Sequence, residues 1–288
     1  MITIYSINYR NRFCLEYQYK TLRAFCKDQY KLVVIDSNGN SDPEDSEFKK
    51  QFCVKNNLEL YVLPDSLNKD YISNSSPITS NVSWILGNKL NYIYKNIIRE
   101  TQPKYFAFLD QDFFAFSPFE LIPTLDKMGM YGDVLERNSD GAWVLHPWLS
   151  FYKYDFVKNY DLDFRPCEGF DTGGCNWNSF VKKANLNKND YWVRHNTIMY
   201  FPFYNHSHHG PSTYEKEYFE YDDKIIYGQV QIYDKKFIHM LNSAHLDNPF
   251  NPKTSWCKGF LDSTILLSGK IPFTTEEGFR NTGPATSV

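Results

Sequence analysis

The chain has 288 residues and a formal net charge of -3 at pH 7, so charge alone gives no reason to expect binding to nucleic acid or an anionic membrane. This length allows one large α/β domain or two small ones, and we expect one. Aromatic residues make up 18% of the chain, but an AT-rich coding sequence yields the same Tyr, Phe, Asn, Lys and Ile excess, so the aromatics alone do not indicate a sugar-binding surface.

The cysteines and the apolar runs bear on the compartment. The six cysteines form no C-x-x-C pair and lack the density of a disulfide scaffold, so we expect reduced thiols. A strand-like segment follows Met1 at once and leaves no room for a cleavable signal peptide. No run approaches the roughly 20 apolar residues of a membrane span. We therefore expect a cytoplasmic protein.

The first part of the chain alternates strands and helices. Strand patterns at 2–9, 32–37 and 58–63 are separated by helical patterns at 13–25 and 43–55. Such an order predicts a right-handed parallel sheet. Neither of the two common glycine-rich phosphate-binding motifs occurs in the chain.

Asp36 ends the second of these strands. In many nucleotide-binding α/β sheets an acidic side chain at this place holds a ribose or a base, so Asp36 is a candidate nucleotide-binding residue. An equally good interpretation is that it begins the turn at Asn38 and Gly39.

A long connection and a helix come next. The Ser/Asn-rich segment 65–81 is longer than usual for an α/β loop, and loops of that length are usually functional or mobile. The segment 82–98 has a helical apolar stripe. Gly87 lies inside this helix and costs about 1 kcal/mol relative to Ala, which predicts close backbone packing there.

Segment 104–120 places two aspartates directly after an apolar run. Residues 105–109 are apolar on both faces, as in an interior strand of a mostly parallel sheet covered by helices. Such sheets bind ligands beyond the carboxyl ends of their strands, where Asp110 and Asp112 would point the same way. We therefore expect the two carboxylates to hold one hard cation, Mn²⁺ or Mg²⁺. The alternative is that they end the strand and begin a turn.

This stretch resembles the D-x-D strand of GT-A fold glycosyltransferases, with a hydrophobic strand, Asp-x-Asp, further aromatics and then a Pro-led helix. The resemblance implies that Asp112 contacts the divalent ion that bridges the diphosphate of a sugar nucleotide. It implies that Asp110 faces the ribose and the waters of the metal. The order of Gly87, Asn91 and the D-x-D strand also resembles the GT-A helix beneath the nucleotide, so Asn91 is a candidate nucleotide-side residue or else a surface Asn.

After the two aspartates the pattern predicts a short helix at 118–127 and strands at 130–136 and 142–152. The segment that begins at His146 resembles the strand that leads toward the acceptor pocket in these transferases. For His146 itself we favour a packed strand residue over a functional one.

The segment 170–178 reads as the start of a helix that carries a carboxylate. By resemblance to the Y/F-D-T-G form found in GT-A enzymes, Asp171 is the candidate catalytic base, and Glu168 is the nearby alternative. A purely structural role for Asp171 as the N-cap residue is equally open.

Histidines concentrate in the last third of the chain. His206, His208 and His209 lie in a turn-rich segment without further zinc ligands at suitable spacing, so we favour a mobile acceptor loop over a metal site. Two short strands are predicted around a turn at Asp234 and Lys235. The segment that follows resembles the late His-containing segment of GT-A enzymes, which implies a third protein ligand of the metal, and the candidates are His239 and then His245.

Together these features predict an α/β, GT-A-like fold with a mostly parallel central sheet. We expect one catalytic domain with a nucleotide-sugar-binding half at 1–115, an acceptor half at 116–248 and a C-terminal wrap without strong periodicity at 249–288.

The predicted activity is metal-dependent transfer of a sugar from a nucleotide-diphosphate sugar, first of all a UDP-sugar, to a hydroxyl of a glycan. A hydroxymethylated pyrimidine of phage DNA is an alternative acceptor. Other open alternatives are a metal-dependent phosphohydrolase or nucleotidyltransferase and a non-catalytic sugar-nucleotide-binding protein.

Overall fold

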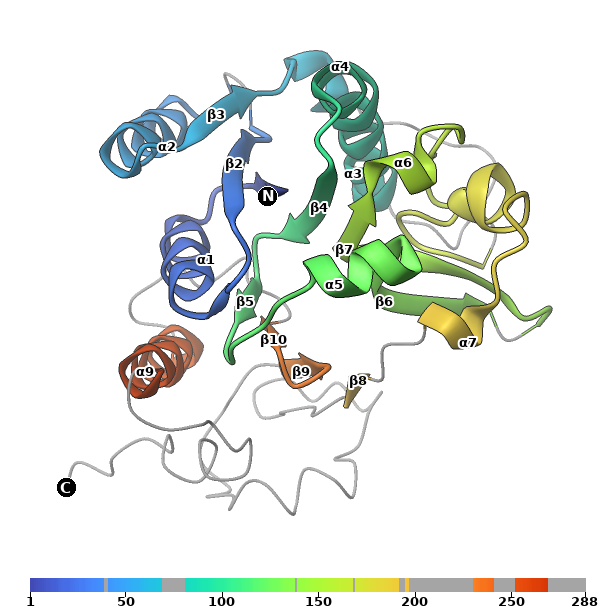
Figure 1. Cartoon of the computed structure of the whole chain (residues 1–288). Coiled ribbons are helices and arrows are strands. Elements are labelled where there is room, and N and C mark those ends of the chain that lie inside the picture. The colour runs from blue at the N-terminus through green and yellow to red at the C-terminus, as the bar shows by residue number, and fades with distance from the viewer. Residues whose placement is uncertain are drawn as a thin grey trace. The chain divides into compact units, whose positions relative to one another are not determined.

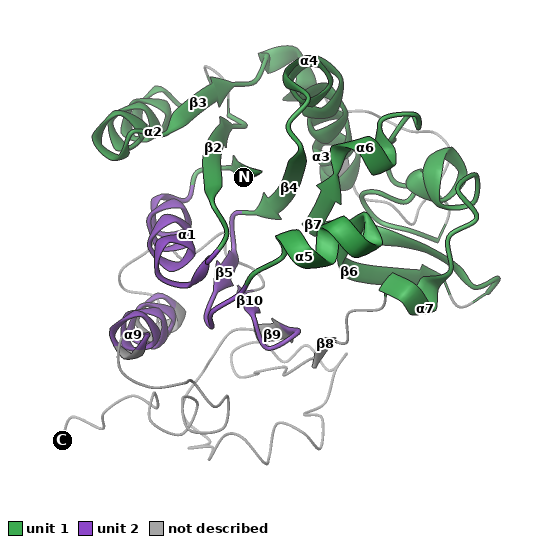
Figure 2. Cartoon of the chain, in the orientation of Figure 1, with its two compact units in different colours: residues 1–10, 28–110, 120–193 green, residues 11–27, 111–119, 194–288 purple. Residues whose placement is uncertain are grey.

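The computed structural model describes residues 1–38, 41–68, 81–137, 139–167, 169–191, 195–196, 230–240 and 252–268. The chain forms two compact units (Figure 2). Unit 1 comprises Met1–Arg10, Asp28–Asp110 and Glu120–Val193, and unit 2 comprises Asn11–Lys27, Gln111–Phe119 and Arg194–Val288. These bounds interleave along the chain and differ from the predicted halves, which stay a prediction. In the described ranges no helix is both long enough and apolar enough to cross a membrane.

Unit 1 contains a six-stranded sheet with the strand order β3-β2-β1-β4-β7-β6 (Figure 1). The first four strands are parallel, and β7 runs antiparallel to both β4 and β6. The predicted fold class, α/β with a mostly parallel central sheet, is confirmed. The strands are β1 (Ile2–Asn8), β2 (Tyr30–Asp36), β3 (Glu59–Val62), β4 (Tyr105–Asp110), β6 (Met130–Arg137) and β7 (Ala142–Lys153).

The helical segments of unit 1 begin and end where local chemistry favours it. In α2, the Asp42 side chain accepts a hydrogen bond from the Asp45 amide at 3.2 Å and Pro43 occupies the first turn. In α5, the Asp28 carboxylate caps the amides of Leu121 and Ile122, so this helix starts later than predicted. The segments are η1 (Asp65–Asn68), α2 (Pro43–Asn56), α3 (Asn81–Ile93), η2 (Tyr94–Ile98), α4 (Arg99–Thr101), α5 (Ile122–Met128), α6 (Tyr154–Val157), η3 (Trp177–Val181) and α7 (Lys188–Tyr191).

The main core of unit 1 lies between one face of the sheet and α3 with η2. Alternate residues of β1, β2 and β4 point into it, because successive side chains of a strand point to opposite faces. The helical side of this core contributes Leu90, Ile93, Tyr94 and Ile97. Apolar burial therefore holds α3 over the strands whose carboxyl ends carry the candidate residues.

Gly87 shows the close packing that the sequence predicted. A Cβ at this position would lie 2.6 Å from the Phe164 carbonyl oxygen and 2.8 Å from the Arg165 Cα. Both are backbone atoms, which cannot rotate away. The α3 helix can therefore approach the segment after α6 only because residue 87 has no side chain.

We expect Gly87→Ala to destabilise the protein by about 1–2 kcal/mol, because the overpacking penalty exceeds the gain in helix propensity. The matched control is Gly259→Ala, since Gly259 also lies in a helix and a Cβ there would meet nothing within 4 Å. The urea unfolding midpoints of the two variants, each compared with the wild type, measure the two changes in stability. Equal stabilisation of the two variants would contradict the close packing at Gly87.

Unit 2 contains a four-stranded antiparallel sheet with the order β5-β10-β9-β8 (Figure 1). The predicted hairpin is confirmed, and both turn residues have positive φ, 50° at Asp234 and 54° at Lys235. The strands are β5 (Phe113–Ala115), β8 (His195–Asn196), β9 (Val230–Tyr233) and β10 (Phe237–Met240).

Two helices complete the described part of unit 2, α1 (Arg12–Phe25) and α9 (Pro252–Leu267). The helix α9 was missed in the sequence, where no strong periodicity was seen. Its buried Cys257, Phe260 and Leu261 belong to one core cluster with residues of α1, β5 and β10. The spacing of these three residues is that of a narrow helical face, and tertiary packing supplies the rest of its stability.

Candidate active site

Asp36 and Asp110 lie at the same edge of the unit 1 sheet, as predicted. In the parallel registers of the sheet, Asp36 is paired with Asn8 and Asp110 is paired with Ile7. Both aspartates are therefore the last residues of parallel strands, at the carboxyl edge where α/β sheets bind ligands.

The Asp36 carboxylate is fully buried and both of its oxygens have partners inside unit 1. Oδ1 accepts hydrogen bonds from Lys49 Nζ at 2.7 Å and from the Asn38 amide at 3.0 Å, and Oδ2 accepts one from Ser46 Oγ at 2.6 Å. Lys49 also pairs with Asp45 at 2.5 Å. These contacts describe a structural role. The predicted contact of Asp36 with a ribose or base stays a prediction, and it would require these contacts to change.

We expect Lys49→Met to destabilise the protein by about 3–5 kcal/mol, because it leaves two buried carboxylates without their cation. The control is Lys158→Met, which breaks an exposed pair with Asp155 and should leave stability nearly unchanged. Thermal unfolding at one pH compares the variants. If Lys49→Met unfolds at the same temperature as the control, the buried network does not stabilise unit 1.

Lys89 is a second buried ammonium group at this edge. It is 5% exposed, and its Nζ donates to the Ser37 carbonyl oxygen at 2.9 Å. The pKa of Lys89 is lowered to about 8, mostly by burial and then by the charge of Lys49, while Asp36 opposes the shift. Lys89 was not predicted as a site residue, although a lysine within a mostly apolar helical segment was the available signal.

The Asn91 side chain links α3 to the chain after α6. Its Nδ2 donates to Asp163 Oδ1 at 2.9 Å, and its Oδ1 accepts from the Phe164 amide at 2.8 Å. This pair of hydrogen bonds positions the same segment that packs on Gly87. A nucleotide-side role for Asn91 stays a prediction beside this structural one.

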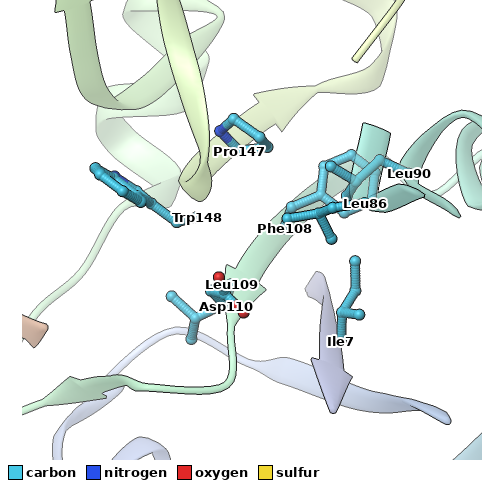
Figure 3. Close-up of a pocket in the computed structure, with 8 residues that line it drawn as sticks. All are labelled: Ile7, Leu86, Leu90, Phe108, Leu109, Asp110, Pro147 and Trp148. Atoms are coloured by element: carbon cyan, nitrogen blue, oxygen red, sulfur yellow. The ribbon is translucent and has the colours of Figure 1, made fainter. Parts of the chain in front are cut away.

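A small pocket of about 10 Å³ opens beside Asp110, with room for about one water molecule (Figure 3). Trp148 lines this pocket, and its indole Nε1 donates a hydrogen bond to Asp133 Oδ2 at 2.8 Å. The His146 ring stacks on the indole, with the ring centroids 3.6 Å apart. His146 is thus a packed strand residue, as favoured. Trp148 was missed, although it shares a strand face with His146. The lining residues are Ile7, Leu86, Leu90, Phe108, Leu109, Asp110, Pro147 and Trp148.

Asp171 is exposed in a turn of unit 1. Its Oδ1 accepts a hydrogen bond from the Thr172 amide at 2.7 Å, and Thr172 Oγ1 donates to the Ser83 carbonyl oxygen in α3 at 3.3 Å. The helical turn η3 begins only at Trp177, so Asp171 is not its N-cap. The carboxylate is available to a substrate while its turn is tied to α3. The alternative, Glu168, lies outside the described residues.

Asp112 and His239 meet inside unit 2. Asp112 Oδ1 lies 3.1 Å from His239 Nε2, and both residues are at least nine-tenths buried. The strand pairing of β10 with β5 sets this contact, since His239 pairs with Phe113 and the Met240 amide donates to the Asp112 carbonyl oxygen at 2.9 Å. The ring of His239 also stacks on that of Phe113 at 4.2 Å.

These two side chains fit a divalent cation. Mg²⁺ or Mn²⁺ holds octahedral ligand atoms at about 2.1 Å, so neighbouring ligand atoms lie about 3 Å apart. In the described part of the chain, Asp112 Oδ1 has no polar partner other than the His239 nitrogen, and a buried carboxylate oxygen in that state suits a cation. An imidazole ligand favours Mn²⁺ over the harder Mg²⁺.

Two protein ligands would leave positions for substrate oxygens and waters. Among the described residues no group of three His, Cys, Asp or Glu side chains is placed to hold a metal. The other candidate histidines, His245, His206, His208 and His209, lie outside the described residues.

No protein-family model and no curated protein matches the chain. Among solved structures, the chain is similar to residues 1–349 of TarS from S. aureus in complex with UDP, with 15% identity and a TM-score of 0.34 over 57% of this chain and 49% of that one. It is also similar to the mannosyltransferase PcManGT from Pyrobaculum calidifontis in complex with GDP-Man and Mn²⁺, with 14% identity and a TM-score of 0.31 over 55% of this chain and 46% of that one.

The chain thus spans about half the length of each of these two structures. The proposals therefore depend on the residues of this chain.

Proposed function

We propose that the protein is a metal-dependent glycosyltransferase that moves a sugar from a nucleotide-diphosphate sugar to an acceptor hydroxyl. The observation that carries this proposal is the buried pair of Asp112 and His239, whose ligand atoms lie 3.1 Å apart directly after the D-x-D strand. A carboxylate and an imidazole at this spacing provide part of a cation site and leave room for diphosphate oxygens.

Each candidate residue has a role in this proposal. Asp112 and His239 would hold Mn²⁺ or Mg²⁺, which supplies Lewis-acid stabilisation of charge on a leaving diphosphate. Asp110 is assigned to the ribose and to waters of the ion. Asp171 would accept the proton of the acceptor hydroxyl if the reaction inverts the anomeric centre, or orient the substrate if it retains the configuration.

The substrates are proposed on chemical grounds. We take a UDP-sugar as the first donor to test and a glycan hydroxyl as the acceptor, in a cytoplasmic setting. A hydroxymethylated pyrimidine of DNA is the second acceptor, and the net charge of -3 counts against it.

The rival classes make different demands on the site. A two-metal phosphohydrolase or nucleotidyltransferase needs further carboxylates beside the first pair, and the described residues do not group three possible ligands. A binding protein needs the nucleotide contacts but no acceptor-side carboxylate. The exposed carboxylate of Asp171 therefore favours a transferase.

Incubation with UDP-sugars and GDP-sugars, with and without Mn²⁺, tests the proposal. We expect release of the intact nucleoside diphosphate from one donor class, only when Mn²⁺ is present, and faster release when acceptor is added. Cleavage within the diphosphate would support a phosphohydrolase. Metal-dependent binding of the donor without release of nucleoside diphosphate would support a binding protein. Release that depends on neither the metal nor the acceptor would overturn the proposal.

A further inference from the structure

Two cysteine thiols of unit 1 lie on neighbouring segments beside the Asp171 turn. Cys175 Sγ donates to the carbonyl oxygen of Pro166, the residue before Cys167, at 3.5 Å. Both cysteines are partly exposed and both are free thiols, whereas Cys14, Cys53 and Cys257 are buried. Thiols on adjacent segments that are open to solvent meet the first two requirements for oxidation by a small molecule.

The backbone holds the two cysteines together. The Cys175 amide donates to the Arg165 carbonyl oxygen at 2.9 Å, and the Phe170 amide donates to the Cys167 carbonyl oxygen at 2.9 Å. A Cβ on Gly174 would lie 3.1 Å from the Cys167 amide nitrogen. The chain therefore doubles back so that the residue before Cys175 passes close to Cys167, and rotation of the two side chains can bring their sulfurs to bonding distance.

We propose that Cys167 and Cys175 are a reversible thiol–disulfide site that takes a small-molecule disulfide, such as glutathione disulfide, as its oxidant, and that its oxidation regulates the turn carrying Asp171. The regulatory half of this proposal rests on the proposed transferase function. The oxidation itself does not.

The exchange balances in two steps. The Cys167 thiolate attacks one sulfur of glutathione disulfide, forms a mixed disulfide and releases one glutathione thiolate, which takes up a proton from solvent. The Cys175 sulfur then gives up its proton and attacks the Cys167 sulfur, which releases the second glutathione. Two protein thiols are oxidised and one glutathione disulfide is reduced to two glutathione molecules.

The order of the steps follows from the surroundings of Cys175. The Cys175 thiol donates its proton to the Pro166 carbonyl oxygen at 3.5 Å, and the neighbouring Cys167 side chain and then burial raise the pKa of this thiol. A thiol that keeps its proton is the poorer attacking group, so Cys167 reacts first and Cys175 resolves the mixed disulfide.

The disulfide would close a short loop around the candidate base. Residues 168–174 lie between the cysteines and include Asp171, Gly173 and Gly174. Gly173 has a φ of 92° and packs on Pro147, so this turn already has little freedom to adjust. Drawing its two ends together is expected to displace Asp171 from its reduced-state position and to lower transfer.

Peptide mapping after equilibration in glutathione redox buffers tests the modification. No Lys or Arg lies between the cysteines, so one tryptic peptide, residues 159–182, carries both. We expect this peptide to lose two hydrogens and both alkylation sites as the buffer becomes oxidising, and to recover in reducing buffer. The matched control is the partly exposed Cys26, which should form only a mixed disulfide with glutathione. Mixed disulfides at Cys167 and Cys175 without the internal bond would overturn the proposal.

Two further readouts separate this proposal from the proposed function. Oxidation should slow amide hydrogen exchange in residues 168–174 of the wild type but not of Cys175→Ser, whatever the activity of the protein. If the protein is a transferase, its activity should fall in proportion to the oxidised fraction, and Cys167→Ser, which lacks the thiol that attacks first, should resist oxidant. An oxidised peptide with unchanged exchange and unchanged transfer would refute the regulatory role, and absence of any transfer in reduced protein would refute only the proposed function.

Discussion

Replacing Asp112 by Asn is expected to lower metal-dependent transfer by about 10²- to 10³-fold, because a bound ion contributes several kcal/mol to the transition state and each 1.4 kcal/mol is tenfold in rate. The fold should persist, since the change removes charge beside His239 and no core volume. Transfer rates and Mn²⁺ affinity, measured on the same samples, check the prediction.

The histidines provide the comparison for Asp112→Asn. We expect His239→Ala to weaken Mn²⁺ binding as Asp112→Asn does, because the two ligand atoms lie 3.1 Å apart. His245→Ala should affect binding less. Normal turnover of Asp112→Asn at limiting metal would show that the D-x-D segment only ends a strand, and unimpaired affinity in both histidine variants would leave the ion to carboxylate, phosphate and water ligands.

Asp171→Asn is expected to give a stable protein that binds donor and transfers sugar about 10²- to 10⁴-fold more slowly, because an amide cannot accept the proton of the acceptor hydroxyl. Stability should change little, since the side-chain oxygen of Asn can still accept the hydrogen bond from the Thr172 amide that Asp171 Oδ1 receives at 2.7 Å. Transfer rates with saturating donor, together with thermal unfolding, check both halves.

The control for Asp171→Asn is Glu168→Gln, the alternative base. We expect that variant to transfer normally. A fully active Asp171→Asn with an impaired Glu168→Gln would move the base to Glu168. Loss of donor binding in Asp171→Asn would also contradict the assignment, because Asp171 is placed on the acceptor side.

Features that depend on neighbours in the chain were readable from the sequence. The apolar runs of β2 and β4 predict interior strands because both of their faces must be apolar when helices cover them. The hairpin turn at Asp234 and Lys235 follows from short-range turn preferences. Gly87 within an apolar helix predicts a close approach of two backbones. In each case the signal and the structure involve the same few residues.

Contacts between residues that are far apart in the sequence could not be predicted from the sequence. The charge of Asp36 is neutralised by Lys49 on the next helix, which makes a candidate ligand-binding carboxylate part of a buried network. The amides at the start of α5 are capped by Asp28, a residue far earlier in the chain. Local propensity cannot specify such contacts, since they form only when separate segments pack.

The same distinction holds for the candidate site, where the sequence indicates the residues and the tertiary structure sets their distances. Asp110 and Asp112 stand out in the sequence because two carboxylates follow an apolar strand, and the resemblance to GT-A enzymes singled out His239 as a ligand candidate. That His239 lies 3.1 Å from Asp112 depends on the pairing of β10 with β5, and the approach of Cys175 to the segment before Cys167 depends on a chain reversal. Short motifs record which chemistry is present, whereas distances between side chains arise from hydrogen-bonded registers and packing that join remote segments.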